Sequence, residues 1–259
     1  MEQMYTGGYS AVVDASKHFY QFRTHPDDWP HLGLIHPVTG EVLIWYGLCM
    51  GSTNSPAIAC RHGQGLIRKL LSRSKVFRQS AQANCWWTEL TYSGYDPNLG
   101  YGFKFLRADG KPAVKIWAHI DDFLIHGPDY DSTCQGLKEF LDLALEVGML
   151  CHPKKLKPPA QVQQYVGFLF DTHSFPRLRI PDDKRDRALA MCDFVSSHPP
   201  NKPFSRLAMA VIAGTLESLA EATPSRVGHT YLRETHKLIH PDGLPTGRDG
   251  YYGRLDRCA

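Results

Sequence analysis

The sequence predicts an α+β fold in which an antiparallel sheet backed by helices is followed by an all-helical region. Two observations predict the first part: apolar runs of strand length meet at Asp121-Asp122, and residues 130–148 have apolar side chains at helical spacing. A third predicts the second part, because every clear pattern after Pro181 is helical. We therefore expect a domain boundary near residue 180.

Each element has its own local signal. Strands are expected on short apolar runs bounded by turn residues, at 9–16, in a hairpin over 32–46, and at 113–120, 122–127 and 163–171. Helices are expected at 57–72, 130–148, 182–195 and 204–220, with a weaker helical segment near 226–239. Residues 76–112 have no clear period and are rich in aromatic residues and glycine, which indicates an insertion. Its aromatic side chains are expected either to pack a small satellite cluster or to stack on bases.

Composition limits the class of protein more than its function. With 42% hydrophobic and 21% charged residues the chain can bury an ordinary globular core, and a net charge of +3 permits nucleic-acid binding without requiring it. The seven cysteines form no C-x-x-C pair and are expected as reduced thiols. No apolar run reaches membrane-spanning length, and the N-terminus lacks a signal-peptide pattern. We therefore expect a soluble, intracellular protein, cytoplasmic or nuclear.

A basic strip follows the second predicted turn region. Between residues 61 and 88 the chain has six Arg or Lys residues and no acidic residue. They are Arg61, Arg68, Lys69, Arg73, Lys75 and Arg78. One interpretation is a solvated helix face, and the other is a strip that follows phosphates.

Adjacent aspartates occur three times, and one pair stands out. The pair at 27–28 lies in a proline-flanked loop, and the pair at 182–183 begins a helix, where acids favour the helix dipole. Asp121-Asp122 is enclosed by apolar, strand-like residues, where two carboxylates repel each other and lose hydration. A hard cation such as Mg²⁺ would relieve that repulsion, while a simple turn pair remains the alternative. Asp14, at the end of another short apolar strand, is the candidate third ligand.

Five segments, taken in order, resemble the motifs of a reverse transcriptase. They are VVDASKHFYQFRTHPDD (12–28), GLCMGSTNSPAIACR (47–61), HIDDFLIHG (119–127), LCHPKKLKPPAQVQQYVGFLFD (150–171) and AVIAGTLESLAEATPSRVGHTYLRETHK (210–237). The last is similar to the thumb of tyrosine-recombinase (DIRS-like) retrotransposons and pararetrovirus-type enzymes. The resemblance implies a polymerase palm over 1–180, with a remnant of the fingers and the insertion at 76–112. It further implies a helical thumb over 181–240 and a tail or linker over 241–259.

The resemblance implies an RNA-directed DNA polymerase that uses a two-metal mechanism. Two Mg²⁺ ions, with Mn²⁺ as an alternative, would be held by Asp14, Asp121, Asp122 and the backbone carbonyl of Ala15. Lys155 matches the lysine proposed as general acid to pyrophosphate, although a plain surface lysine is an equal interpretation.

The resemblance also implies contacts with substrates. Phe19 would exclude a ribose 2′-hydroxyl by bulk, or simply pack in the core, and Met50 and Gly51 would lie near the nucleotide. The expected partners are deoxynucleoside triphosphates and an RNA or DNA template with its primer; no membrane is expected, and the oligomeric state stays open. The implied nucleic-acid contacts are Ser55, Pro56, Arg61, Arg68, Lys69, Arg73, His119, Tyr165 and Gly167.

Some residues depart from the family's pattern. His119 replaces the usual Tyr, and Cys49 to Ser52 replace the usual Pro-Phe-Gly-Leu. Only 13 residues precede Asp14, so the fingers are expected to be largely absent and activity reduced. Two alternatives follow: a catalytically inactive palm kept as a nucleic-acid-binding module, and another palm-fold enzyme such as a nucleotide cyclase, which would lack the thumb-like helices.

Overall fold

The computed structural model describes residues 4–77, 112–199, 205–220, 222 and 232. The chain forms two compact units, Met1–Arg177 and Leu178–Ala259. The expected insertion at 76–112, the helical segment at 226–239 and the tail at 241–259 fall almost entirely outside the described residues. Within the described part of the chain, no helix combines the length and apolar character needed to cross a membrane.

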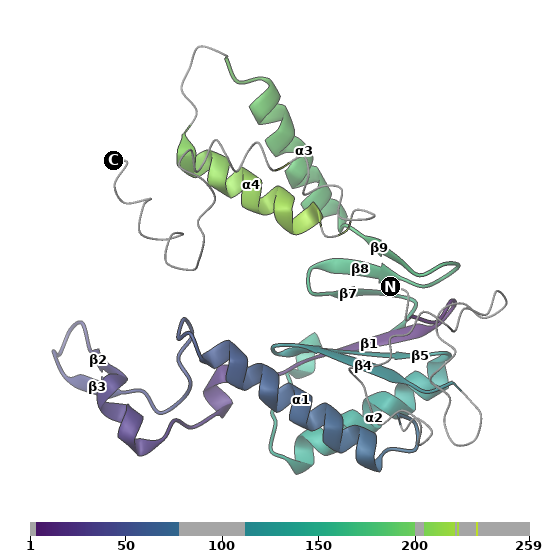
Figure 1. Cartoon of the computed structure of the whole chain (residues 1–259), viewed down its shortest axis with the longest axis horizontal. Coiled ribbons are helices and arrows are strands. Elements are labelled where there is room, and N and C mark those ends of the chain that lie inside the picture. Colours follow the sequence, from purple (N-terminus) through teal and green to yellow (C-terminus); the bar gives the residue numbers. More distant parts are fainter. Residues whose placement is uncertain (1–3, 78–111, 200–204, 221, 223–231, 233–259) are drawn as a thin grey trace. The chain divides into compact units, whose positions relative to one another are not determined.

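A four-stranded antiparallel sheet forms the centre of the first unit, and the expected α+β class is confirmed (Figure 1). The strand order is β4 (Lys115–His119), β5 (Asp122–Gly127), β1 (Tyr9–Asp14) and β6 (Lys157–Ala160). Strand β6 carries no strand signal in the sequence, because it contains two prolines, which cannot donate to a ladder. Proline is tolerated at a sheet edge, which is where β6 lies.

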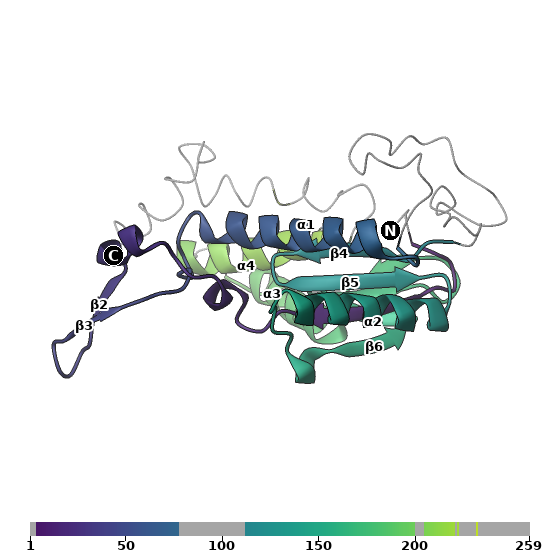
Figure 2. The ribbon, with the colours of Figure 1, turned by 90° about the horizontal axis from the view of Figure 1, so that it is seen from below.

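Two helices cover one face of this sheet, α1 (Ser55–Arg73) and α2 (Tyr130–Glu146) (Figure 2). Residues that alternate along the strands divide between two cores. Val13 and Phe123 face the helices and pack in the same cluster as Phe140 of α2. Val12 and Leu124 face the other way, into a smaller cluster that includes Met4 and Tyr165.

The single strand expected over 163–171 is wrong, because the chain reverses in its middle. Two strands, β7 (Val162–Tyr165) and β8 (Phe168–Asp171), pair through a two-residue turn. Val166 and Gly167 both have positive φ, at 46° and 81°. A tight hairpin requires this handedness, and glycine adopts it without strain. A third strand, β9 (Arg177–Arg179), follows β8 in the same small sheet.

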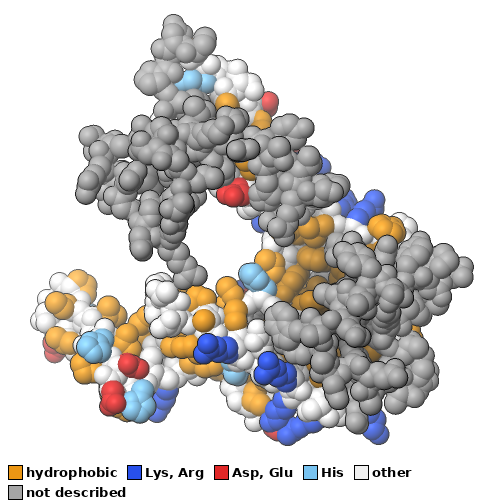
Figure 3. Space-filling model, viewed as in Figure 1, with side chains coloured by type: hydrophobic (Ala, Val, Ile, Leu, Met, Phe, Trp, Pro, Cys, Tyr) orange, Lys and Arg blue, Asp and Glu red, His pale blue; other side chains and the backbone are white. Residues whose placement is uncertain are grey.

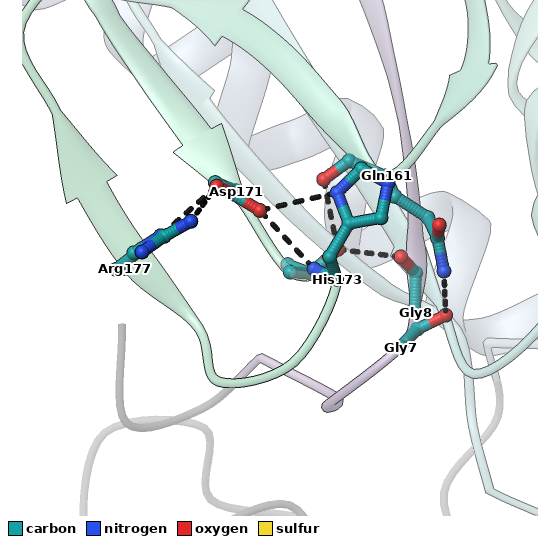
Figure 4. A network of polar contacts seen from close by, with 7 residues as sticks. Gly7, Gly8, Gln161, Asp171, His173 and Arg177 are labelled. Atoms are coloured by element: carbon teal, nitrogen blue, oxygen red, sulfur yellow. Dashed lines mark hydrogen bonds and ion pairs between the residues drawn. The ribbon is translucent and has the colours of Figure 1, made fainter.

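Asp171 closes the turn between β8 and β9 (Figure 4). Its carboxylate accepts hydrogen bonds from the backbone N–H of His173, at 3.2 Å, and from Nε of Arg177, at 2.9 Å. These bonds lower the pKa of Asp171 to about 2, and the bond from the backbone of His173 contributes most. The buried carboxylate therefore stays ionised and ties the two strands together.

The first residues of the chain are held against the sheet by buried polar contacts. Thr172 Oγ1 donates to the carbonyl of Gly8 at 2.6 Å, and Gln161 Nε2 donates to the carbonyl of Gly7 at 2.9 Å (Figure 4). His126 of β5, which is fully buried, accepts from the backbone N–H of Tyr5 at 2.7 Å through Nε2. Its Nδ1 therefore carries the proton and donates to Ser10 Oγ at 2.9 Å.

A second hairpin, β2 (Gly33–Ile35) with β3 (Val42–Ile44), projects from the first unit. All six strand residues are exposed, and hydrophobic side chains cover the hairpin in Figure 3. Short 3₁₀ segments complete this unit at His18–Gln21, Pro26–His31 and Pro153–Lys155. In the second unit α3 (Asp182–Ser196) and α4 (Arg206–Ala220) lie where helices were expected.

A candidate carboxylate site at the end of the sheet

The β4–β5 hairpin ends in a two-residue turn that carries one of the paired carboxylates. Ile120 and Asp121 form the turn, and His119 and Asp122 face each other across its base. Ile120 has a φ of 56°, in the left-handed region that branched side chains rarely adopt. Such a conformation costs about 1–3 kcal/mol and persists only where surrounding contacts hold it. The hairpin thus presents Asp121 at a strained tip.

Asp14, the last residue of β1, lies beside this turn. Asp14 and Asp122 are direct register partners in the antiparallel pair of β1 and β5. Side chains at such positions share one face of the sheet, with Cβ atoms about 4.5–5.5 Å apart. One residue further along, the N–H of Ala15 donates to the carbonyl of Asp121 at 2.8 Å. Carboxylates from distant parts of the sequence therefore gather at one end of the sheet.

The electrostatics of Asp122 show the proximity of the three carboxylates. Partial burial raises its pKa first, and the negative charges of Asp121 and Asp14 raise it further. The positive charges of Lys155 and His119 act in the opposite direction. The end of the sheet therefore carries negative charge that its own side chains only partly balance.

Lys155 supplies the nearest cation. Its Nζ lies 2.8 Å from Oδ2 of Asp14, and the pKa of Lys155 is raised by that bond and charge, and further by Asp121 and Asp122. The Asp14 side chain is 13% exposed whereas that of Lys155 is 58% exposed, so water can reach the ammonium group. An ion pair of this kind is worth little in stability, so Lys155 can leave Asp14 at small cost.

The donor chemistry suits a hard divalent cation, because carboxylate oxygens are its preferred ligands and the local charge is in excess. The side chains do not form a finished cage: among the described residues no group of three or more His, Cys, Asp or Glu side chains is arranged to hold a metal ion. Asp14 is instead bonded to Lys155. A cation at this place would have to displace Lys155 from Asp14.

No protein-family model matches the sequence, and no curated protein sequence does. Solved structures match it in fold, and three are foamy viral protease-reverse transcriptases. One, a foamy viral protease-reverse transcriptase dRH in complex with double-stranded DNA, has a TM-score of 0.59 and 14% sequence identity over 94% of this chain. A second, in complex with an RNA/DNA hybrid, has a TM-score of 0.56 and 13% sequence identity over 92% of this chain. A third, in complex with double-stranded DNA, has a TM-score of 0.53 and 14% sequence identity over 96% of this chain.

The chain has a reverse-transcriptase-like fold. It spans about a third of the first foamy viral chain, 32%, and 28% and 45% of the other two. At these sequence identities the similarity shows the fold alone and assigns no role to individual residues.

The residues expected near a nucleotide lie on two segments of the reverse-transcriptase-like unit. Phe19 is half-buried in the 3₁₀ turn that follows Asp14, and Met50 and Gly51 are exposed in the loop before α1. Gly51 has a φ of 90°, which requires glycine. Ser55 begins α1 and is buried, with its Oγ donating to the carbonyl of Cys49 at 2.8 Å.

The residues expected at the primer side lie around Asp122. Tyr165 of β7 donates through its Oη to the carbonyl of Asp122 at 3.3 Å, and burial raises the pKa of this tyrosine. Gly167 forms the β7–β8 turn, and His119 is exposed opposite Asp122. These contacts connect the β7–β8 hairpin directly to the carboxylate strand.

The basic strip of α1 is divided between two environments. Lys and Arg side chains follow α1 on the face shown in Figure 3. Lys69 and Arg73 form ion pairs with Glu146 at the end of α2, at 3.0 Å and 2.7 Å. Part of their positive charge is therefore balanced within the protein. Arg61 is exposed nearer the start of α1, as is Pro56, and Arg68 is exposed further along.

On the interpretation of α1 as a strip that follows phosphates, this division predicts unequal contributions to nucleic-acid binding. Replacing Arg61 by Ala should reduce the slope of log affinity against log salt by roughly 0.7–0.9, the value of one phosphate contact. Replacing Arg73 by Ala should change the slope less, because its charge is already shared with Glu146. Titration of a labelled primer-template at several salt concentrations measures both slopes. A larger change for Arg73→Ala would show that the ion pair opens on binding.

A histidine cluster that was not expected from the sequence lies beneath the turn. His18 is 2% exposed, and its Nε2 lies 3.3 Å from Nδ1 of His62 on α1. The Phe22 ring packs on both imidazoles, with centroid distances of 5.1 and 4.9 Å. Burial lowers the pKa of His18 first, and His62 lowers it further, while Asp121 raises it. No sequence signal pairs His18 with His62, because only the fold brings α1 to the segment after Asp14.

Proposed function

We propose that this chain is an RNA-directed DNA polymerase domain that adds deoxynucleotides to a primer by a two-metal mechanism. One observation carries the proposal: Asp14 and Asp122 are register partners, with Asp121 at the adjoining turn, at the end of a reverse-transcriptase-like sheet. The foamy viral structures of this fold contain double-stranded DNA or an RNA/DNA hybrid, which supports nucleic acid as the partner.

The reaction needs the primer 3′-hydroxyl to lose its proton to solvent and its oxygen to bond to the α-phosphorus, while the bond to the bridging oxygen of pyrophosphate breaks. Asp14, Asp121 and Asp122, with the carbonyl of Ala15, would hold two Mg²⁺ ions, for which Mn²⁺ can substitute. When bound, these ions lower the pKa of the 3′-hydroxyl and offset charge on the phosphates. The three carboxylates position this charge at the strand ends, where β1 and β5 hold Asp14 and Asp122 in fixed register.

Lys155 has two successive roles in this proposal. Without a cation it neutralises Asp14 through the 2.8 Å ion pair. In the loaded site its exposed ammonium would turn to the triphosphate and give a proton to the departing pyrophosphate oxygen. A lysine side chain is ordinarily protonated at neutral pH, so the ammonium would carry the proton that this step needs.

The remaining residues would bind substrates. Phe19, on the turn after Asp14, would pack under the incoming sugar and exclude a 2′-hydroxyl, and Met50 and Gly51 would border the nucleotide. The primer end would lie on His119, Tyr165 and Gly167. The template would lie along the following set: Pro56, Arg61, Arg68, Lys69 and Arg73. Ser55, which is buried, would support this surface from within by holding the loop before α1 through its bond to Cys49.

A second function, an inactive nucleic-acid-binding module, has one observation in its favour: Asp14 is already paired with Lys155, and the described residues form no finished metal site. Primer extension separates the two. The chain, supplied with a labelled primer on an RNA template, Mg²⁺ and the four deoxynucleoside triphosphates, should extend the primer only when the template is present.

The matched variants are Asp121→Asn, in the candidate site, and Asp28→Asn, in the exposed pair at 27–28. Asp121→Asn should abolish extension and keep primer-template affinity within a few-fold, whereas Asp28→Asn should change neither. Tight template binding with no extension by the unaltered chain would instead support the binding module.

A further inference from the structure

Gln21 joins two loops that the proposed mechanism needs together. Its Nε2 donates to the carbonyl of Ser16 at 2.6 Å and to that of Leu150 at 3.0 Å. Its Oε1 accepts from the N–H of Leu150 at 2.9 Å. The side-chain amide therefore satisfies both backbone groups of Leu150, as a neighbouring strand would.

This contact continues a short ladder between the two loops. The N–H of Ser16 donates to the carbonyl of Leu150 at 2.8 Å, and the N–H of His152 donates to the carbonyl of Asp14 at 2.9 Å. Ala15 and Cys151 form an isolated antiparallel bridge between them. Gln21 lies at the end of this ladder and adds two hydrogen bonds at Leu150, one to its carbonyl and one from its N–H.

Side-chain packing holds the loop that carries Lys155 at separate points. Met149 is buried, and Cys151 and Leu156 pack against the core. The Leu150 side chain is 65% exposed, and residues 153–155 are exposed as well. At Leu150 the path of the loop is therefore held by hydrogen bonds to its backbone, and the Gln21 side chain makes two of them.

We propose that Gln21 is a positioning residue that holds the Lys155 loop against the segment after Asp14, and thereby keeps the Lys155 ammonium beside the carboxylates. The proposal rests on the proposed function for its effect on catalysis. Its structural part stands on the contacts of Gln21 alone, so the two can fail separately.

The structural test uses Gln21→Met, which keeps length and removes all three hydrogen bonds, with Gln135→Met as the matched control. Gln135 is on the exposed side of α2, and its side chain bonds only Glu139, at 3.4 Å, in the contacts described. Amide hydrogen exchange of Leu150 and His152 should accelerate about 10-fold in Gln21→Met, the loss of roughly one hydrogen bond. Exchange at Leu124 in β5 should not change.

A second readout follows Lys155 itself. Acetylation of the chain by a limiting reagent, followed by mass spectrometry, compares Lys155 with its neighbour Lys154. Lys155 is protected by its bond to Asp14, so its acetylation relative to Lys154 should rise several-fold in Gln21→Met and stay constant in Gln135→Met. Unchanged exchange at Leu150, or an unchanged ratio of Lys155 to Lys154, overturns the proposal.

The catalytic test is a double-mutant cycle on primer extension. Gln21→Met should lower kcat about 10-fold with KM for the nucleotide changed less than about 2-fold. In a Lys155→Met background the same substitution should have almost no further effect, because Gln21 acts through Lys155. An equal loss in both backgrounds overturns the proposal. If the unaltered chain does not extend primers, the proposed function fails, and exchange and acetylation alone decide the role of Gln21.

Discussion

Replacing Asp14 by Asn should lower the rate of primer extension by at least about 10³-fold. Asn has nearly the same size but no charge, so it would bind only weakly the hard cations that offset the negative charge of the reacting phosphates. Removing one well-placed electrostatic group typically costs about 10²–10³ in rate. Asp14 would also help to hold the cations, so its loss should exceed that. Single-turnover extension with preformed primer-template complex measures the chemical step without a contribution from binding.

The fold should survive this change. Asp14 contributes one ion pair with a half-exposed lysine, and its negative charge repels Asp122, so both effects on stability are small and opposite. We expect the Tm of Asp14→Asn to stay within a few degrees of the unaltered chain. Asp28→Asn again serves as the control. Extension by Asp14→Asn within about 10-fold of the unaltered rate would remove Asp14 from the list of metal ligands.

The second large effect concerns stability in acid, and it comes from His126. Burial, and then the charge of Lys115, lowers the pKa of this imidazole to about 3, from 6.5 in an unfolded chain. Between these values the unfolded chain binds a proton that the folded chain does not. Folding stability from this group is therefore complete above pH 6.5 and is lost as the pH falls toward 3. Below pH 5.5 the free energy of unfolding contributed by this group falls by about 1.4 kcal/mol for each pH unit.

Urea unfolding followed by circular dichroism from pH 7.5 to 4.0 tests this expectation. His126→Asn should be less stable at pH 7.5, by about 2–4 kcal/mol, because the buried Tyr5 N–H and Ser10 hydroxyl lose good partners. Its stability should also fall less steeply below pH 6.5. His31→Gln, at an exposed position, should keep the full pH dependence. Parallel curves for His126→Asn and the unaltered chain would exclude His126 as the source.

Much of the fold could be predicted from the sequence because its signals are local. The pattern of β5, DFLIHG, and the helical spacing of α2 depend only on nearby residues, and both elements lie where they were expected. The error over 163–171 has an equally local cause. Val166-Gly167 is a turn signal, but it lies inside an apolar run that by itself is typical of one continuous strand.

The neighbours of the candidate site could not be predicted in this way. The charge pattern leaves open whether Lys69 and Arg73 lie on a solvated helix face or follow phosphates, and it gives no sign that both contact Glu146 on a different helix. The partners of Gln21 and of His18 are likewise distant in sequence, and neither residue carried a signal. Long-range polar contacts depend on where whole elements pack, which a local pattern does not encode.

By itself the sequence determined the class of fold, the order of its elements and the suspicion that Asp121-Asp122 is more than a turn, since adjacent carboxylates within apolar runs are costly wherever they fold. Only the tertiary structure decided which charged groups lie close enough to interact. The register of β1 on β5 places Asp14 opposite Asp122, and the loop after α2 brings Lys155 to Asp14. Electrostatic interaction depends on distance in space, and that distance exists only once the sheet has formed.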